Sequence, residues 1–242
     1  LHSYGDLVMW PWGYASAGAP NEAGLSAIGR KLANYNGYTA QQGADLYPTS
    51  GDSVDWAYGE LGIPAYTFEL GSSGEGFTPP YSVVDQSQWP ENRGALVYAA
   101  KIARRPYELV YGPDAKEIDV THDTGSAVCV TALIDDAANG GDAIGGAEIT
   151  LDTPPWVTNA VAYAMTPVDG GFDSTAEHVE VVLPLSVFQR DVTIGYVYGR
   201  DAGGSTGPPT AVYIVIPEPG VGVGAIAVLC ALRRAAAGRE RC

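Results

Sequence analysis

The sequence predicts an α/β unit over residues 1–106, an all-β unit over residues 107–216 and a short hydrophobic C-terminal helix within residues 217–242. In the first region, apolar residues at helical spacing alternate with short buried strands. Runs of β-branched residues separated by Gly, Pro and Asp turns fill the second, and a Gly-rich apolar run followed by arginines forms the third. With 242 residues, of which 46% are hydrophobic, the chain is long enough to form two packed cores.

The first region carries the periodicities of both helices and strands. Leu25, Ile28 and Leu32 recur at i, i+3 and i+7, which predicts a helix that follows Asn21 and ends at Gly37. Short apolar runs and turn residues predict the other elements: a strand at 7–10, a short helix at 55–61, a strand at 65–70 and an amphipathic helix at 92–105 that Pro106 ends.

The second region predicts a β-sandwich. Short strands separated by turn residues are typical of that architecture. Residues 197–204 (VYGRDAGG) resemble the last strand and turn of the immunoglobulin-like modules appended to secreted bacterial enzymes. Cys129 is expected to be a buried thiol within one of the strands. The predicted strands are residues 127–134, 147–151, 159–165, 179–183, 192–198 and 211–216.

The chain is acidic, with a formal net charge of −15. Residues 107–216 carry 16 acidic and 3 basic side chains, whereas residues 217–242 carry 2 acidic and 4 basic ones. Because phosphate contacts require clustered Lys and Arg, this balance argues against nucleic acid as a partner. An acidic surface of this kind instead suits a secreted protein.

Four motifs stand out in residues 1–106: HSYGDLVMWPWGY at 2–14, YPTSGDSVDW at 47–56, YTFEL at 66–70 and GSSGEGFTPP at 71–80. An imidazole is a good zinc ligand, and a carboxylate at the end of an apolar strand costs desolvation energy unless it has a partner or a task. In order and in spacing, the four motifs resemble the zinc carboxypeptidases of the carboxypeptidase A/T family. The resemblance covers residues 1 to about 105, less than half of the chain.

The resemblance implies that His2 is the last of the zinc ligands and that Glu69 is the general base. It implies one Zn²⁺ ion, held only in the complete domain, because a catalytic zinc takes three protein ligands and a water. Glu69 would take a proton from the activated water and deliver it to the leaving amine. Taken without the resemblance, Glu69 would instead be a cap or one half of a salt bridge.

The resemblance also implies a set of substrate-binding residues. Tyr47 would close over the substrate's C-terminal residue, the alternative being an ordinary loop tyrosine. Ser3 and Tyr4 would form part of the subsite wall, with a cis peptide between them in relatives, and Phe77 would line the substrate groove.

Two further residues would set the polarity of the specificity pocket. Val54 favours apolar or aromatic C-terminal residues, and Asp52 could pair with Lys or Arg. The pocket would therefore accept both apolar and basic C-terminal residues, as in the carboxypeptidase T branch of the family. The alternative for Asp52 is that it caps the helix at Asp55. Asp55 and Trp56 are expected to be structural, as a cap and a packed aromatic.

The chain also departs from the family pattern. It contains no His-x-x-Glu, the motif that supplies the first two zinc ligands, and it lacks the oxyanion-stabilising Arg and the Asn-Arg pair that grips the substrate carboxylate. We therefore expect an N-terminally truncated chain, the C-terminal part of a catalytic domain. Because one His holds zinc too weakly, this fragment should be inactive alone.

Two acidic, glycine-rich segments in the second region could offer oxygen ligands to calcium: residues 135–142 and 169–173. Neither has the spacing of an EF-hand loop. Plain turns are the favoured interpretation, and calcium is the less favoured one.

The end of the chain resembles a PEP-CTERM sorting signal, which exosortase-type machinery processes in Gram-negative bacteria. Residues 217–219 (PEP) precede an apolar run at 220–232, and arginines follow it. The run has 13 residues, fewer than the roughly 20 that a spanning helix needs, so we expect transient membrane contact. The alternative is a frayed, alanine-rich tail.

Together these features predict a secreted or cell-envelope zinc metallocarboxypeptidase from a Gram-negative bacterium, acting on the C-termini of peptides or proteins. The alternative is a non-catalytic, surface-displayed binding or adhesion module built on a degenerate carboxypeptidase half. An in-frame His-x-x-Glu upstream of this chain would favour the enzyme.

Overall fold

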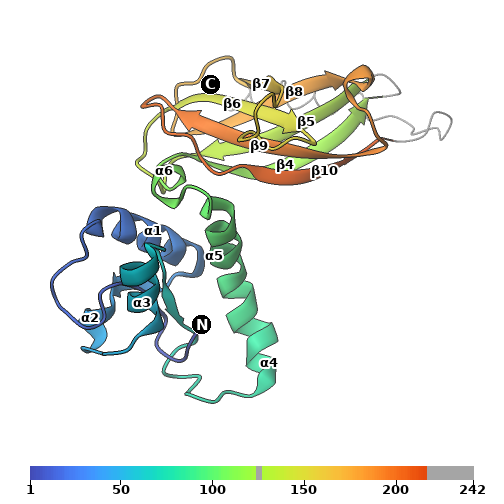
Figure 1. The fold of residues 1–242 in the computed structure, drawn as a ribbon. Coiled ribbons are helices and arrows are strands. Elements are labelled where there is room, and N and C mark those ends of the chain that lie inside the picture. The colour runs from blue at the N-terminus through green and yellow to red at the C-terminus, as the bar shows by residue number, and fades with distance from the viewer. Residues whose placement is uncertain (124–126, 217–242) are drawn as a thin grey trace, which may run out of the picture. The chain divides into compact units, whose positions relative to one another are not determined.

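The computed structural model describes residues 1–123 and 127–216, which fold as two compact units, Leu1–Val110 and the residues from Tyr111 onward (Figure 1). The first is an α/β unit and the second is built of β-strands. Within the described ranges, no helix is long and apolar enough to cross a membrane. The predicted C-terminal helix and sorting segment, residues 217–242, lie outside the described residues.

A three-stranded mixed sheet forms the centre of the first unit. β1 (Leu7–Trp10) is its middle strand, with β2 (Thr39–Gln42) parallel to it on one side and β3 (Thr67–Glu69) antiparallel to it on the other. The helical elements are α1 (Glu22–Asn36), α2 (Gly43–Leu46), α3 (Ser53–Leu61), α4 (Tyr81–Val83), the π-helical turn η1 (Val84–Gln88), α5 (Trp89–Ile102) and α6 (Pro106–Leu109).

The core of this unit forms where α1 and α5 pack against each other and α1 packs on β1 and β2. The predicted apolar stripe of α1 is confirmed, because Leu25, Ile28 and Leu32 are all buried. Gly37 ends α1 in the left-handed conformation, with φ of 74°, and its N–H donates to the Ala33 carbonyl. Glycine adopts this conformation without the steric cost that a Cβ would impose.

Several predicted boundaries in this unit were wrong. The last long helix begins at Trp89 rather than residue 92, because η1 runs directly into it. It ends at Ile102 rather than at residue 105, and Pro106 instead opens α6. Proline is tolerated in a first helical turn, since its missing N–H has no partner there anyway. The polar strand β2 has no apolar alternation, and sequence reasoning missed it.

Seven antiparallel strands form one continuous sheet in the second unit, in the order β10-β9-β6-β7-β8-β5-β4. β7 joins the two halves, because Ala162–Met165 pair with β6 whereas Thr166 and Pro167 pair with β8. The strands are β4 (Asp114–Asp123), β5 (Ala127–Asp135), β6 (Ile144–Leu151), β7 (Ala162–Pro167), β8 (Ala176–Pro184), β9 (Val192–Asp201) and β10 (Thr210–Val215), with a 3-10 turn, η2 (Leu185–Val187), after β8.

This sheet curls nearly into a barrel. Its end strands approach each other, since the Thr210 hydroxyl on β10 donates to the Ala115 carbonyl on β4 at 2.7 Å. The core inside it is aliphatic, with Val130, Ile134 and Ile149 fully buried, and Cys129 is buried as predicted. All six predicted strands are present, whereas the immunoglobulin-like sandwich stays a prediction.

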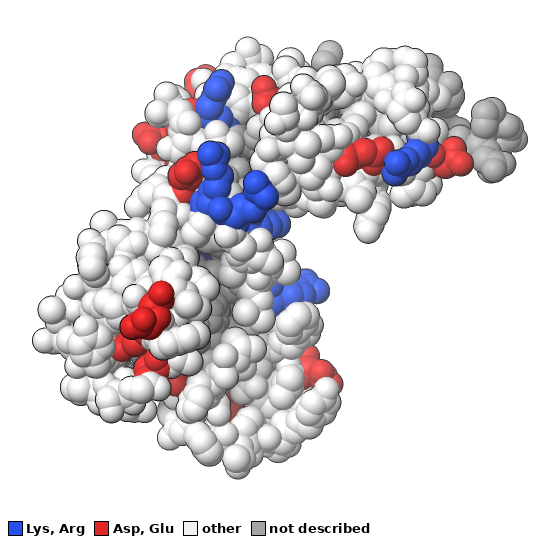
Figure 2. Space-filling model, in the orientation of Figure 1, with Lys and Arg blue, Asp and Glu red and all other residues white. Residues whose placement is uncertain are grey.

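The second unit carries most of the net negative charge, with 16 acidic and 3 basic side chains in residues 107–216. On the face shown in Figure 2, acidic side chains occur in separate places with large uncharged areas between them. On this face, therefore, the acidic side chains do not form one continuous patch.

Candidate active site

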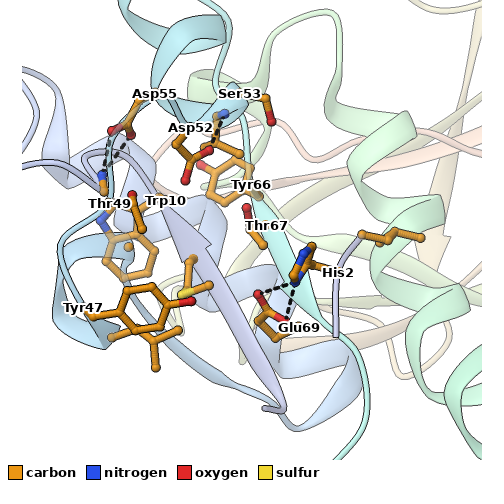
Figure 3. Close-up of a pocket in the computed structure, with 16 residues that line it drawn as sticks. His2, Trp10, Tyr47, Thr49, Asp52, Ser53, Asp55, Tyr66, Thr67 and Glu69 are labelled. Carbon is orange, nitrogen blue, oxygen red and sulfur yellow. Dashed lines mark hydrogen bonds and ion pairs between the residues drawn. The ribbon is translucent and has the colours of Figure 1, made fainter. Parts of the chain in front are cut away.

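His2 lies beside Glu69, the last residue of β3. The main chain of His2 runs along the edge of β3 opposite β1: its N–H donates to the Phe68 carbonyl at 2.8 Å, and its carbonyl accepts from Leu70 N–H at 2.9 Å. His2 Nδ1 is 3.2 Å from Glu69 Oε1 and 3.3 Å from Oε2 (Figure 3). The structure thus brings together the predicted zinc ligand and the predicted general base, 67 residues apart in the sequence.

The two side chains differ sharply in exposure. Glu69 is 8% exposed, whereas the His2 side chain is 68% exposed. The imidazole is therefore accessible to an ion or a substrate, and the carboxylate beneath it is largely shielded from bulk water. A carboxylate in this position can accept a proton from a molecule held against the imidazole.

A pocket of about 400 Å³ lies between this pair and the segment that leads into α3 (Figure 3). It is lined by five residues that the sequence singled out: His2, Tyr47, Asp52, Val54 and Glu69. The predicted base, metal ligand and specificity residues therefore share one cavity.

The helix α3 is capped by Asp52, whose Oδ1 accepts a hydrogen bond from Val54 N–H at 2.8 Å. The capping alternative is therefore what the structure shows, although Asp52 also lines the pocket. The expectation that Asp55 is a cap was wrong. Trp56, expected to be packed, is 59% exposed because it lies on the outward side of α3.

Asp55 instead fastens the loop after β1. Its two carboxylate oxygens accept hydrogen bonds from Gly13 N–H, both at 2.9 Å, and Oδ2 accepts from Tyr14 N–H at 3.1 Å. The Gly13 carbonyl in turn accepts from Thr49 N–H at 2.9 Å. These bonds fix the wall of the pocket opposite His2. Sequence reasoning missed them, because an Asp in the first turn of a helix is equally typical of a local cap.

Tyr47 lies in the segment between α2 and α3 and is 61% exposed. Its ring stands at the rim of the pocket on the side away from Glu69 (Figure 3). An exposed ring on a short loop is free to change its rotamer at little cost in packing.

Ser3 and Phe77 line a second cavity of about 550 Å³, which shares His2 with the first one. The Ser3 hydroxyl donates to the Phe77 carbonyl at 3.4 Å, and the Tyr4 and Phe77 rings meet edge-on with centroids 6.3 Å apart. The peptide bond between Ser3 and Tyr4 is cis. The structure thus gathers Ser3, Tyr4 and Phe77 close to one another.

Two aromatic residues that the sequence did not single out support the pocket: the half-buried Tyr66 and the buried Trp10. The Tyr66 hydroxyl donates to the Leu25 carbonyl at 3.0 Å, and Trp10 Nε1 donates to Glu22 at 2.6 Å. Burial raises the pKa of the Tyr66 phenol, and Tyr107 and Glu22 raise it further. The hydroxyl therefore remains protonated, as the hydrogen bond to Leu25 requires.

The potential metal ligands in the first unit fit part of a zinc site. Catalytic zinc takes three protein ligands, for which neutral imidazole is well suited. His2 offers one such ligand beside a carboxylate, whereas His122 and His178 belong to the second unit. Among the described residues, the one group of three or more potential metal ligands within reach of each other is also in the second unit. The described part of the first unit thus offers one zinc ligand and a base, not a full coordination shell.

The segment that contains His2 and Glu69 is similar in sequence to known proteins. Residues 1–93 match the sequence model of the zinc carboxypeptidase family. A zinc carboxypeptidase of Saccharothrix mutabilis subsp. capreolus is 38% identical over 91 residues, which are 34% of this chain and 21% of that protein. Carboxypeptidase O of Bos taurus is 43% identical over 89 residues, which are 33% of this chain and 24% of that protein.

The chain therefore spans between a fifth and a quarter of the length of these curated relatives. Among solved structures, a polysaccharide deacetylase of Bacillus cereus is similar with a TM-score of 0.28 and 17% identity, covering 42% of this chain and 30% of that one. A likeness this weak carries no argument about fold or function.

Proposed function

We propose that this chain contributes one side of the active site of a zinc-dependent metallocarboxypeptidase that releases C-terminal residues from peptides or proteins. The observation that carries the proposal is the contact of His2 with Glu69 at the mouth of a pocket. It occurs within the residues that match the zinc carboxypeptidase family.

In the proposed mechanism His2 is one zinc ligand, and two further ligands come from sequence outside this chain. When bound, the ion would polarise the scissile carbonyl and lower the pKa of a water. Glu69 accepts the proton of the attacking water and then donates it to the leaving amine. The burial of Glu69 supports this role, because a shielded carboxylate exchanges protons with the reacting atoms rather than with bulk water.

The first pocket is the proposed site for the side chain of the substrate's C-terminal residue. Val54 gives its wall an apolar surface, and Asp52 adds a carboxylate that attracts Lys or Arg. Tyr47 closes over the bound residue from the rim. Ser3 and Phe77 bind the preceding part of the peptide in the second cavity, together with Tyr4, whose ring contacts Phe77.

The test is an assay of C-terminal residue release by the complete protein, expressed with the coding sequence upstream of this chain. Release should stop with a zinc chelator and return with added Zn²⁺. Glu69→Gln should lower the rate by roughly 100-fold or more, because it removes the proton acceptor while keeping its shape. Glu60→Gln, on the exposed side of α3, is the matched control and should leave the rate unchanged.

A near-normal rate for Glu69→Gln would sink the assignment of the base. A complete protein that releases no residue and lacks an upstream His-x-x-Glu would favour the non-catalytic binding module instead.

Two further parts of the proposal concern regions away from the pocket. The second unit, called the β unit from here on, acts as an immunoglobulin-like spacer that holds the enzyme away from the cell surface. Residues 217–242 act as a PEP-CTERM-like signal that exosortase-type machinery processes, with transient contact to the inner membrane. Mass spectrometry of envelope material from the native host tests the second part: the mature protein should end near Pro219, and recovery of an intact C-terminus at Cys242 would contradict it.

A further inference from the structure

Three carboxylates meet at one end of the β unit. Asp136 directly follows β5, Asp142 lies in the turn before β6, and Asp201 ends β9. The fold brings them together because Ile144 at the start of β6 pairs with Asp201. One carboxylate oxygen from each lies within 4.8 Å of those of the other two.

The deepest of the three, Asp136, has an acceptor atom without a donor. The residue is fully buried, and its Oδ2 accepts a hydrogen bond from Asp142 N–H at 2.8 Å. Its Oδ1 is also buried, yet none of the described residues donates a hydrogen bond to it. An unsatisfied buried carboxylate oxygen costs free energy, so its presence points to a partner that is not a protein donor.

The charges of the cluster are also unbalanced. Asp201 is 3% exposed, and its Oδ1 accepts from Ser205 N–H at 2.8 Å. Within the described ranges, no Lys or Arg forms an ion pair with any of the three carboxylates. Burial raises the pKa of Asp136, and the negative charges of Asp201 and Asp142 raise it further, against the lowering effects of the Asp142 and Gly141 N–H groups. A cation between the carboxylates would remove this repulsion.

Two glycines border the space between the carboxylates. A Cβ at Gly203 would lie 3.2 Å from Asp201 Oδ1 and 3.7 Å from Asp142 Oδ2. A Cβ at Gly140 would lie 3.6 Å from Asp136 Oδ2 and 3.8 Å from Asp142 Oδ2. Since neither residue has a side chain, this space is left for an ion and its waters, and the exposed Asp142 opens it to solvent.

We propose that Asp136, Asp142 and Asp201 bind one Ca²⁺ ion at this end of the β unit. Carboxylate oxygens select hard cations, and Ca²⁺ accepts six to eight oxygen ligands at about 2.3–2.6 Å, several of which can be water. Two oxygens on opposite sides of such an ion are up to about 5 Å apart, which the spacing of the cluster allows. Mg²⁺ needs shorter bonds and stricter octahedral geometry, so it fits the wide, partly open cluster less well.

The experiment is calorimetric titration of CaCl₂ into the full chain after removal of bound calcium with EGTA, with thermal unfolding followed in parallel. We expect one site with a dissociation constant below about 1 mM, and unfolding of the β unit that shifts upward by at least about 5 °C in saturating Ca²⁺. MgCl₂ should bind at least about tenfold more weakly.

Variants of Asp142 and Asp201 test where the ion binds, and the fully buried Asp136 is left unchanged. Asp142→Asn removes an exposed charge, so the variant should fold normally and bind Ca²⁺ at least about tenfold more weakly. Asp201→Asn should weaken binding at least as much. Asp173→Asn makes the same chemical change in the other acidic turn, and it should bind as the unchanged chain does.

Absence of binding at about 10 mM CaCl₂ would overturn the proposal, because extracellular calcium modules bind within that range. Full binding by both Asp142→Asn and Asp201→Asn would overturn it as well, since the ion would then lie elsewhere. Equal affinity for Mg²⁺ would overturn the assignment to calcium.

Discussion

Asp55 holds Gly13 with both oxygens of its carboxylate, each 2.9 Å from the Gly13 amide nitrogen across 42 residues of sequence. This contact fastens the first turn of α3 to the loop that follows β1. Because that loop and α3 form the wall of the pocket opposite His2, the shape of the pocket depends on a carboxylate that touches no substrate in the proposed mechanism.

Replacing the Asp55 carboxylate should lower the free energy of unfolding of the first unit. Asp55→Asn leaves one carbonyl acceptor but removes the charge, so we expect a loss of about 1–3 kcal/mol in the free energy of unfolding. Asp45→Asn on α2, where the side chain is exposed, is the control and should change stability by less than about 0.5 kcal/mol. Urea unfolding followed by tryptophan fluorescence measures both, because four of the five tryptophans are in this unit. Equal stability of the two variants would contradict this role for Asp55.

The two roles of Asp52 can be separated by two substitutions. Asparagine is as good an N-cap as aspartate, so Asp52→Asn should keep the stability of α3, whereas Asp52→Ala should lose about 1 kcal/mol. In the proposed carboxypeptidase, Asp52→Asn should lower the release of C-terminal Lys and Arg relative to apolar residues. The measurements are urea unfolding and a panel of peptides with different C-terminal residues. An unchanged preference would leave Asp52 with the capping role alone.

The core of the β unit should be sensitive to small cavities. Val130 on β5 is fully buried, whereas Val182 on the neighbouring β8 is 61% exposed. Val130→Ala removes two buried methyl groups and should cost about 2 kcal/mol or more, and Val182→Ala should cost less than about 0.5 kcal/mol. Thermal unfolding of both variants by circular dichroism checks the difference. Similar midpoints would mean that the packing around Val130 is looser than described.

The close approach of two loop segments in the β unit gives a further prediction. A Cβ at Gly207 would collide with the carbonyl of Pro113, which is backbone and cannot turn aside. Gly207→Ala should therefore destabilise this unit by about 1–3 kcal/mol or more. A Cβ at Gly146 would meet nothing nearer than Arg200 Nη2 at 3.8 Å, so Gly146→Ala is the control and should be tolerated. A Gly207→Ala protein with an unchanged unfolding midpoint would contradict the clash.

The sequence predicted those parts of the fold in which the apolar pattern follows the period of the element. α1 and the six strands from β5 onward belong to this class. β4 does not, because a bulge between Lys116 and Asp119 shifts the inward-facing positions of the strand by one residue. Ala115 packs inward before the bulge, Ile118 within it and Val120 after it. No single alternation runs through the strand, so its sequence reads as a polar loop.

In the site, short motifs located His2 and Glu69, but they could not tell which side chains hold the pocket together. Asp52 and Asp55 are both acidic residues at the start of one helix, and the sequence alone gives no way to assign one to the cap and the other to a loop 42 residues away. The sequence placed Asp136 and Asp142 in one segment, 135–142, that could bind calcium, but it did not connect Asp201 with them. Asp201 is distant in sequence from Asp136, and only the pairing of β6 with β9 brings the two together.

The hydrogen bond between Thr210 and Ala115 has a consequence for how the protein behaves at high concentration. β4 and β10 are the two ends of the sheet, and the unpaired edge of an end strand is a template on which a strand from another molecule can add. Because the curl of the sheet turns these two edges toward each other, each limits access to the other. The β unit is thus protected against edge-to-edge aggregation by its own curvature, a protection that does not depend on its charge.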